Sequence, residues 1–315
     1  LGALLALVPS AAEAKKRPKT PTVEIINLYD AFGKNPSGTE ESFGFSALVR
    51  HGDTTILFDA GTSADILAKN AAALGVDLAE VDYAVASHAH ADHTGGFDAL
   101  RTASPDAKIY MPADFFGLAG PLTFSVAGPE PDAGTELPEH LRYFDGVHTD
   151  AKLHSDGRFY KAVEYVSESL ELAPGVRLVA TTSSNMGYFT RYPGVDLEGN
   201  PAEGEAKFLE LPELSLAIDT PDGQVLLVGC SHSGVETIVD AARAQSDTPI
   251  TLLAGGFHLI PYDRDTLRGI GMRLAEKGVA QVAPAHCTGH LGFLVLGEVF
   301  GEGFRFFGLG EAIEP

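Results

Sequence analysis

The sequence predicts an α/β fold in which strands and helices alternate along the chain. Short apolar segments separated by Gly and Asp turn residues begin at Thr22. A strand–helix–strand order follows between residues 55 and 86, which is typical of a sheet covered by helices. The second half of the chain then repeats the order of a hairpin followed by a helix.

In the first half, short apolar runs bounded by turn residues predict four strands, at residues 23–28, 45–50, 55–58 and 81–86. The second and third of these form a hairpin about Gly52-Asp53. Residues 64–74 carry apolar side chains at helical spacing and end at Gly75, which predicts a helix. The fourth strand leads directly into Ser87 and His88.

Residues 112–157 contain five prolines, many glycines and no clear periodicity, so we expect a long, lid-like excursion. After it, apolar runs predict strands at residues 160–172, 177–181, 214–218, 224–228, 250–253 and 280–283. The hairpin of 214–218 and 224–228 turns at Pro221-Asp222-Gly223. Helices are predicted at residues 235–244 and 264–276, each followed by a strand.

The first 21 residues differ from the rest of the chain. Residues 1–9 form an apolar run, and Ala12-Glu13-Ala14 fits the small-x-small pattern of a cleavage site. We therefore expect residues 1–14 to be part of a signal peptide, residues 15–21 to be a linker, and residues 22–315 to form one domain with the excursion at 112–157. The mature protein would then be exported, to the periplasm or outside the cell. The alternative is that the apolar run is a buried terminal strand or helix.

Composition excludes several classes of protein. The chain has 315 residues, with 22 Lys and Arg against 43 Asp and Glu, and a formal charge of −21. This acidity argues against a nucleic-acid partner, and an apolar content of 44% argues against a disordered chain. Two cysteines cannot build a disulfide framework, and beyond residue 14 no apolar stretch is long enough to cross a bilayer. We expect a small-molecule substrate and no stable membrane insertion, with the oligomeric state open.

The strongest chemical signal is the segment that follows the strand at 81–86. His88, His90, Asp92 and His93 lie within six residues, and imidazole and carboxylate groups are suitable ligands for zinc, manganese and iron. On an extended turn, His88 and His90 would point the same way, while Asp92 and His93 would face a second ion. The alternative is a solvated turn that happens to be rich in histidine.

The pattern His88-x-His90-x-Asp92-His93 resembles the signature of the metallo-β-lactamase superfamily, and the resemblance covers nearly the whole mature chain. The segments at residues 58–61, 229–234, 255–259 and 284–290 carry the rest of the similarity. The last three resemble the branch of 7,8-dihydropterin-6-yl-methyl-4-(β-D-ribofuranosyl)aminobenzene 5'-phosphate synthase. The resemblance implies a four-layer αβ/βα sandwich with a binuclear metal site along one edge of two sheets.

The resemblance also implies metal ligands. His88 and His90 would bind the first metal, whereas Asp92, His93 and the late His286 would bind the second. Most of the superfamily supplies a further histidine to the first metal from a Gly-His-Thr turn, but this chain has no histidine between positions 154 and 232. His232, at the end of a predicted strand, is the expected replacement.

Cys230 occupies the position of the family's bridging aspartate. A thiolate can bind zinc, so Cys230 either ligates a metal or supports the ligands around it. The expected cofactors are two divalent ions, zinc first, with manganese or iron as alternatives. Because the bridging carboxylate is missing, a single bound metal is a further alternative.

Other residues have weaker signals. His258 follows two glycines at a strand end and would shuttle a proton, orient substrate or support a ligand. Asp59 is expected to hydrogen-bond the metal loop, and Cys287 to pack beside His286 or, near zinc, to be reactive. Tyr188, Arg191 and His290 are candidates for the substrate pocket.

Together these features predict a metal-dependent hydrolase that uses a metal-activated water on an ester, lactone or phosphodiester-type substrate. In this hypothesis Asp92 orients the nucleophile and His258 is the general acid. The alternatives are a transferase similar to the pterin synthase, and a metal-binding protein with little turnover. The chain has no Gly-x-Ser-x-Gly motif and no phosphate-binding Gly-x-x-x-x-Gly-Lys motif.

Overall fold

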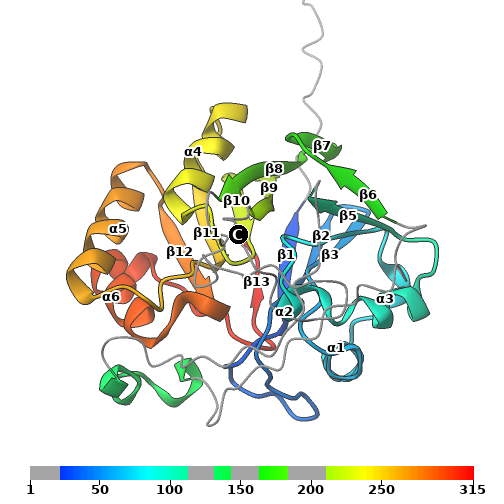
Figure 1. Ribbon diagram of the computed structural model, residues 1–315, viewed down its shortest axis with the longest axis horizontal. Coiled ribbons are helices and arrows are strands. Elements are labelled where there is room, and N and C mark those ends of the chain that lie inside the picture. The colour runs from blue at the N-terminus through cyan, green and yellow to red at the C-terminus, as the bar shows by residue number, and fades with distance from the viewer. Residues whose placement is uncertain (1–21, 113–130, 143–162, 184–210) are drawn as a thin grey trace, which may run out of the picture.

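The computed structural model describes residues 22–112, 131–142, 163–183 and 211–315. Two mixed sheets face each other, and helices cover their outer faces (Figure 1). The predicted four-layer α/β sandwich is therefore confirmed. The predicted signal peptide and linker lie outside the described residues, as does most of the excursion at 112–157.

The first sheet has the strand order β13-β1-β2-β3-β4-β5-β6. Its strands are β1 (Val23–Tyr29), β2 (Ser46–His51), β3 (Thr54–Phe58), β4 (Tyr83–Val85), β5 (Lys108–Pro112), β6 (Val163–Val166) and β13 (Ala312–Ile313). From β3 to β6 the strands run parallel, whereas β1 pairs antiparallel with both β2 and β13. Helices α1 (Ala64–Ala73) and α3 (Phe97–Ala103) cover its outer face through a cluster that includes Leu57, Leu67 and Leu100.

The second sheet has the order β12-β11-β10-β9-β8-β7. Its strands are β7 (Leu170–Ala173), β8 (Val176–Ser183), β9 (Leu211–Thr220), β10 (Gly223–Val228), β11 (Ile250–Gly256) and β12 (Gln281–Ala285). The last three run parallel, and the others pair antiparallel. Helices α4 (Val235–Gln245), α5 (Arg264–Glu276) and α6 (His290–Phe300) cover its outer face.

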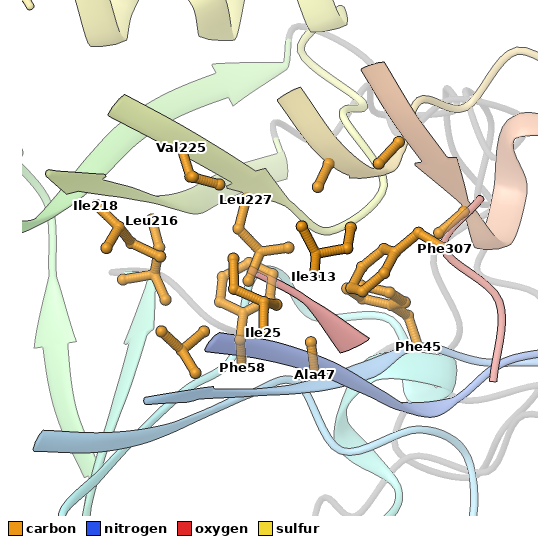
Figure 2. Packing of buried hydrophobic residues seen from close by; sticks show 14 of the residues in the cluster. Ile25, Phe45, Ala47, Phe58, Leu216, Ile218, Val225, Leu227, Phe307 and Ile313 are labelled. Carbon is orange, nitrogen blue, oxygen red and sulfur yellow. The ribbon is translucent and has the colours of Figure 1, made fainter. Parts of the chain in front are cut away.

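The main core lies between the two sheets. Phe45, just before β2, and Phe58, at the end of β3, pack with Leu216 of β9 and Leu227 of β10 (Figure 2). All four side chains are fully buried. Burying a side chain of this size contributes about 2 kcal/mol each. This packing holds the two sheets, and therefore their strand ends, in a fixed relation.

The structure adds elements that the sequence pattern did not predict: β5, α6 and β13. Helix α3 begins directly after Gly95 and Gly96, where these glycines were expected to let the chain turn into a helix. Helix α6 packs against both the second sheet and α5, and its side chains are apolar around most of the helix. Its residues therefore show no one-sided helical pattern. The run at 160–172, predicted as one strand region, is divided. The polar residues 167–169 carry the chain from β6 in the first sheet to β7 in the second.

Within the excursion, the described residues contain two short 3-10 helices, η2 (Pro131–Glu136) and η3 (Glu139–Leu141). Gly134 of η2 packs against the His290 ring at the start of α6. Among the described helices, none has both the length and the apolar character needed to cross a membrane.

Candidate metal centre

The predicted ligands converge where the strands of both sheets end. In the first sheet, β3 and β4 run parallel and deliver Asp59 and Ser87 to the same edge. In the second sheet, the parallel strands β10, β11 and β12 end just before Cys230, His258 and His286. Carboxyl ends of parallel strands meet at one sheet edge, so distant segments of the chain are brought together there.

The histidine-rich segment turns from β4 into the short helix α2 (Ala91–Thr94), with His90 at the N-cap position. Close packing holds this turn in place, because a Cβ atom at Gly96 would lie 1.9 Å from the carbonyl oxygen of Ala60. The glycine at this position is therefore required sterically. His88 and His93 are fully buried within the turn.

A first group of potential ligands consists of His88, Cys230 and His232, whose ligand atoms all lie within 4.8 Å of one another. His90 lies beside this group: its Nδ1 is 3.0 Å from His88 Nε2, and its ring centroid is 4.6 Å from that of His232. Among the described residues, neither ring nitrogen of the buried His232 has a hydrogen-bond partner. A buried imidazole in this state is suited to coordinate a cation, because unsatisfied buried polar atoms are costly.

A second group consists of Asp92, His93, Cys230 and His286. His93 Nε2 lies 3.1 Å from both Cys230 Sγ and His286 Nε2, and Asp92 Oδ2 lies 3.3 Å from His286 Nε2. Cys230 is common to both groups. The seven predicted ligand residues thus lie close together: six of them make up the two groups, and His90 lies beside the first.

The residues of the first position fit a divalent metal in their protonation as well as their placement. Burial lowers the pKa of His88 well below its usual value, and nearby histidines add to the effect. Burial likewise lowers the pKa of His90 to about 4 and that of His232 well below its usual value. These imidazoles are neutral at pH 7, which is the form that binds zinc, manganese or iron.

The second position is more polar. Burial opposes the charged form of Asp92, but the charges of His93 and His286 lower the pKa of its carboxyl below the usual range. Burial also opposes the charged form of His286, yet the neighbouring Cys287 and Asp92 raise its pKa to about 9. A carboxylate, two imidazoles and a thiol form a donor set that is common for zinc.

Three buried carboxylates hold the turns that carry these ligands. Asp59 accepts hydrogen bonds from the Ser87 backbone N–H (2.6 Å) and hydroxyl (2.7 Å), and its Oδ2 lies 2.6 Å from His93 Nδ1. This is the predicted contact of Asp59 with the metal loop. A carboxylate at the other nitrogen of a ligating histidine fixes the orientation of the ring.

Sequence reasoning missed the other two carboxylates. Glu213, in β9, accepts hydrogen bonds from the backbone N–H groups of His232 (2.8 Å) and Ser233 (2.6 Å). Asp30, just after β1, accepts one from the His286 N–H (3.2 Å), and burial raises its pKa to about 7. The signal that could have found Glu213 is an acidic residue directly before the apolar run 214–218.

Backbone strain is concentrated at the same strand ends. Asp59, Ser231, His258 and His286 all have positive φ, between 46° and 66°. Such values are uncommon for residues other than glycine and cluster at functional sites. Each of the four follows a strand that supplies the site.

The remaining predicted residues are placed as follows. The His258 ring lies 4.2 Å from that of His232, so it borders the first position. His290 begins α6 and packs on Gly134, away from the two ligand groups. Burial lowers its pKa to about 4. Tyr188 and Arg191 lie outside the described residues.

Cys287 joins neither of these two groups but contacts Cys230, with 3.2 Å between the two sulfurs, and the pair forms a third cluster of donor atoms with His258. Burial raises the pKa of the Cys230 thiol well above its usual value, and the adjacent Cys287 adds to the rise. Burial also opposes charge on Cys287, but the hydrogen bond with Cys230 and the positive charge of His286 lower its pKa well below the usual value.

Comparison with known proteins agrees with this geometry. Residues 39–162 match the family model of the metallo-beta-lactamase superfamily. The chain is 25% identical over 271 residues to 7,8-dihydropterin-6-methyl-4-(beta-D-ribofuranosyl)-aminobenzene-5'-phosphate synthase of Methanocaldococcus jannaschii, and the match spans 82% of this chain and 84% of that protein.

Solved structures show the same relation. A metal-dependent hydrolase of the beta-lactamase superfamily is 25% identical, has a TM-score of 0.67, and covers 93% of this chain and 99% of its own. A metallo-beta-lactamase fold protein of Bacillus subtilis, at 13% identity and a TM-score of 0.50 over 94% of this chain and 100% of its own, shares the fold.

The family model thus identifies a metallo-beta-lactamase domain over residues 39–162, and the fold is similar to that of a solved hydrolase of that superfamily. The chain is also similar over most of its length to the pterin synthase of M. jannaschii, as the glycine, cysteine and histidine motifs at 229–234, 255–259 and 284–290 indicated. The fold is that of the superfamily's metal-dependent hydrolases.

Proposed function

We propose that this protein is a metal-dependent hydrolase that acts on an ester, lactone or phosphodiester-type substrate. The observation that carries the proposal is the pair of adjacent ligand groups sharing Cys230, with His88 and His232 on one side and Asp92, His93 and His286 on the other. The similarity to a metal-dependent hydrolase at a TM-score of 0.67 supports it.

A divalent metal held by these ligands would lower the pKa of a coordinated water toward 7 and polarise an oxygen of the substrate. Asp92 is the ligand-group residue best placed to orient the attacking water, because its side chain is 15% exposed whereas His93 and His286 are fully buried. His93 and His286 keep the Asp92 carboxylate ionised, so it can accept a hydrogen bond from that water.

His258 is the candidate general acid, which would donate a proton to the leaving group. The residue is partly exposed, its two ring nitrogens are buried, and its ring lies beside that of His232 just after the end of β11. Two serines next to ligand residues in sequence are already engaged: Ser87 Oγ donates to Asp59, and Ser231 Oγ donates to the carbonyl of Gly256. Their engagement supports attack by water over attack by a side-chain hydroxyl.

A second candidate function is a transfer reaction like that of the pterin synthase. It is favoured by the match to that enzyme over 82% of this chain. The same residues would hold the metal, and a second substrate would take the place of water as the attacking group. We rank it second because the predicted export of the chain would separate it from cytosolic pterin intermediates.

The test is a panel of esters, lactones and phosphodiesters offered to protein reconstituted with zinc, manganese or iron. We expect turnover of at least one class, its loss on chelation, and its loss in His88→Ala. The matched control is His140→Ala, because His140 packs on Phe306 and belongs to neither ligand group.

Two outcomes would contradict the proposal. Metal-replete protein with no chelator-sensitive turnover on any class would indicate a metal-binding protein. Formation of the pterin condensation product by purified protein, without hydrolysis, would place the transferase first. Metal stoichiometry, measured on the same samples, shows whether one or two positions are filled.

A further inference from the structure

The two cysteines of the chain meet at the edge of the candidate metal centre. Cys230 follows β10 and Cys287 follows β12, so 57 residues of sequence and one intervening strand separate them. Their sulfurs nevertheless lie 3.2 Å apart, and both side chains are buried. The pair packs with Ile260 in a small apolar cluster of its own.

The contact depends on the strand between them. Gly256, the last residue of β11, lies between the two cysteines, and a Cβ atom there would come within 2.9 Å of Cys287 Sγ. The absence of a side chain at this position lets Cys287 reach across β11. On either side the backbone is fixed, since Gly256 N–H donates to the Gly229 carbonyl and Leu259 N–H donates to the Cys287 carbonyl.

The two sulfurs differ in their relation to the metal ligands. Cys230 Sγ is part of both ligand groups and lies 3.1 Å from His93 Nε2. Cys287 Sγ is part of neither of them; it contacts Cys230 Sγ, and the two sulfurs form a separate cluster with His258. The single Cys230 sulfur is therefore within reach of both His93 and Cys287.

We infer that Cys230 and Cys287 form an oxidisable dithiol, and that a disulfide between them and a metal ligated by Cys230 exclude each other. Its oxidant is a small hydroperoxide, a class of reagent of small enough size to react with a buried pair. The exclusion rests on the proposed metal centre, whereas formation of the disulfide does not.

The chemistry balances with hydrogen peroxide as oxidant. One cysteine sulfur attacks a peroxide oxygen, the O–O bond breaks, and the products are a sulfenic acid and water. The second sulfur attacks the sulfur of the sulfenic acid, the S–O bond breaks, and a second water leaves as the S–S bond forms. Two thiols are oxidised by two electrons, and one peroxide is reduced to two waters. The sulfurs must approach by about 1 Å to reach a disulfide length of about 2.05 Å.

A metal at Cys230 opposes this reaction because the same sulfur lone pairs serve the metal and the new bond. With free metal at about ten times its dissociation constant, mass action predicts that oxidation is slowed about tenfold. In the reverse direction, the disulfide removes a ligand from both groups, so oxidised protein should hold metal more weakly than reduced protein.

The experiment treats full-length metal-free protein and zinc-loaded protein with hydrogen peroxide, quenches with catalase, and alkylates remaining thiols in denaturant. We expect the metal-free protein to lose both thiols together with about 2 Da of mass, reversibly with dithiothreitol, and to yield a peptide linking 230 to 287. The zinc-loaded protein should react about tenfold more slowly. Zinc released from oxidised protein is followed with a chromogenic chelator.

Cys287→Ser is the matched variant, because it removes the partner sulfur and leaves Cys230 in place. It should retain zinc, show an unchanged far-ultraviolet circular dichroism spectrum, and form no intramolecular disulfide. Cys230→Ser should also form none and should hold zinc more weakly.

Three results would overturn the inference. Metal-free wild-type protein that keeps both thiols, or oxidises only to sulfinic acid, would show that the pair does not close. Equal oxidation rates with and without bound zinc would remove the exclusion. Loss of zinc in folded Cys287→Ser would make Cys287 a ligand itself. Since the first readout uses metal-free protein, its failure is distinct from a failure of the hydrolase proposal.

Discussion

At the scale of single residues, the site depends on carboxylates that lie outside the metal-ligand groups. Asp59, Glu213 and Asp30 each accept backbone hydrogen bonds from a different ligand-bearing turn. A ligand histidine is only as well placed as the backbone that carries it, and a buried N–H without an acceptor is costly. The three carboxylates therefore set the positions of ligands from three distant segments.

Glu213 provides a direct test of this role. In Glu213→Gln one acceptor oxygen remains, but the amide group faces the backbone N–H groups of His232 or Ser233, so the turn loses part of its support. We expect the free energy of unfolding of metal-free protein to fall by about 1–3 kcal/mol. Zinc affinity, measured by chelator competition, should fall as well.

The control for this variant is Glu236→Gln. Glu236 pairs with Arg273 between α4 and α5, where Arg273 is exposed to solvent and loss of the ion pair should change stability little. If Glu213→Gln behaves like this control in both measurements, the carboxylate does not position His232.

At the scale of elements, close packing fixes the metal loop against the end of β3. Gly95 and Gly96 have no room for a side chain, since their Cβ atoms would lie 2.1 Å and 1.9 Å from the carbonyl oxygens of Thr62 and Ala60. These obstacles are backbone atoms, which cannot move without displacing β3 or the loop. The path of the chain between His93 and α3 is therefore determined by two glycines.

We accordingly expect Gly96→Ala to lower the free energy of unfolding by about 1–3 kcal/mol through overpacking, with loss of bound zinc. Gly297→Ala is the control. Gly297 lies in α6, where a Cβ atom would meet its nearest neighbour only at 4.0 Å, so alanine should raise stability by up to about 1 kcal/mol. Urea denaturation of both variants measures the contrast, and equal effects would disprove the steric argument.

The pairing of β8 with β9 carries a pH-dependent contribution far from the ligand groups. Arg177 donates to both carboxylate oxygens of Asp219, at 2.7 and 3.0 Å. This hydrogen bond from Arg177 lowers the pKa of Asp219. Because the folded pKa lies below that of the unfolded chain, the pair stabilises the protein above about pH 4, and this stability is lost as the pH falls through the folded pKa.

We therefore expect Asp219→Asn to destabilise the protein by about 0.5–1 kcal/mol at pH 6, the low value reflecting the partial exposure of the pair. The difference from wild type should shrink below about pH 4, where wild type loses the charge too. Urea denaturation at several pH values measures this difference in the free energy of unfolding. The control is Asp240→Asn, which removes the exposed ion pair of Asp240 with Lys277. A difference that grew on acidification would contradict the sign.

At the scale of the whole molecule, the candidate centre joins the two sheets. His88, Asp92 and His93 extend from the first sheet, whereas Cys230, His232 and His286 extend from the second. Bound metal would add links between two halves that otherwise meet through their apolar faces. Only the folded chain brings these ligands within reach of one another, so metal binding must stabilise the fold.

Removal of metal should therefore lower the melting temperature. With free zinc at about 100 times its dissociation constant, the stabilisation is about 2.7 kcal/mol, which corresponds to a shift of several degrees. Differential scanning calorimetry with and without chelator measures it. His140→Ala should show the full shift and His88→Ala a reduced one, and an equal shift in both variants would place the metal elsewhere.

The sequence predicted most elements whose pattern is local. The hairpin of β2 and β3 and helix α5 followed from turn residues and one-sided apolar spacing, and α5 was found with its observed bounds. Helix α6 was missed because it is apolar around most of its surface, and β13 because a strand of two residues has no pattern.

For the site, the predicted ligands were found because chemistry and spacing coincide within short motifs. Glu213 and Asp30 were not, because their partners are backbone N–H groups brought close only by the pairing of strands. The contact of Cys230 with Cys287 depends on the absent side chain of Gly256, a relation among three strands that no single segment shows.

The positive φ angles at Asp59, Ser231, His258 and His286 imply a conflict between robustness and function. A left-handed conformation costs about 1–2 kcal/mol for a residue with a side chain, and glycine would relieve it. Selection for thermal endurance alone would therefore favour glycine at these four positions. Engineering for thermal stability should leave these four residues unchanged, because glycine there would remove side chains that hold or border the metal-ligand groups.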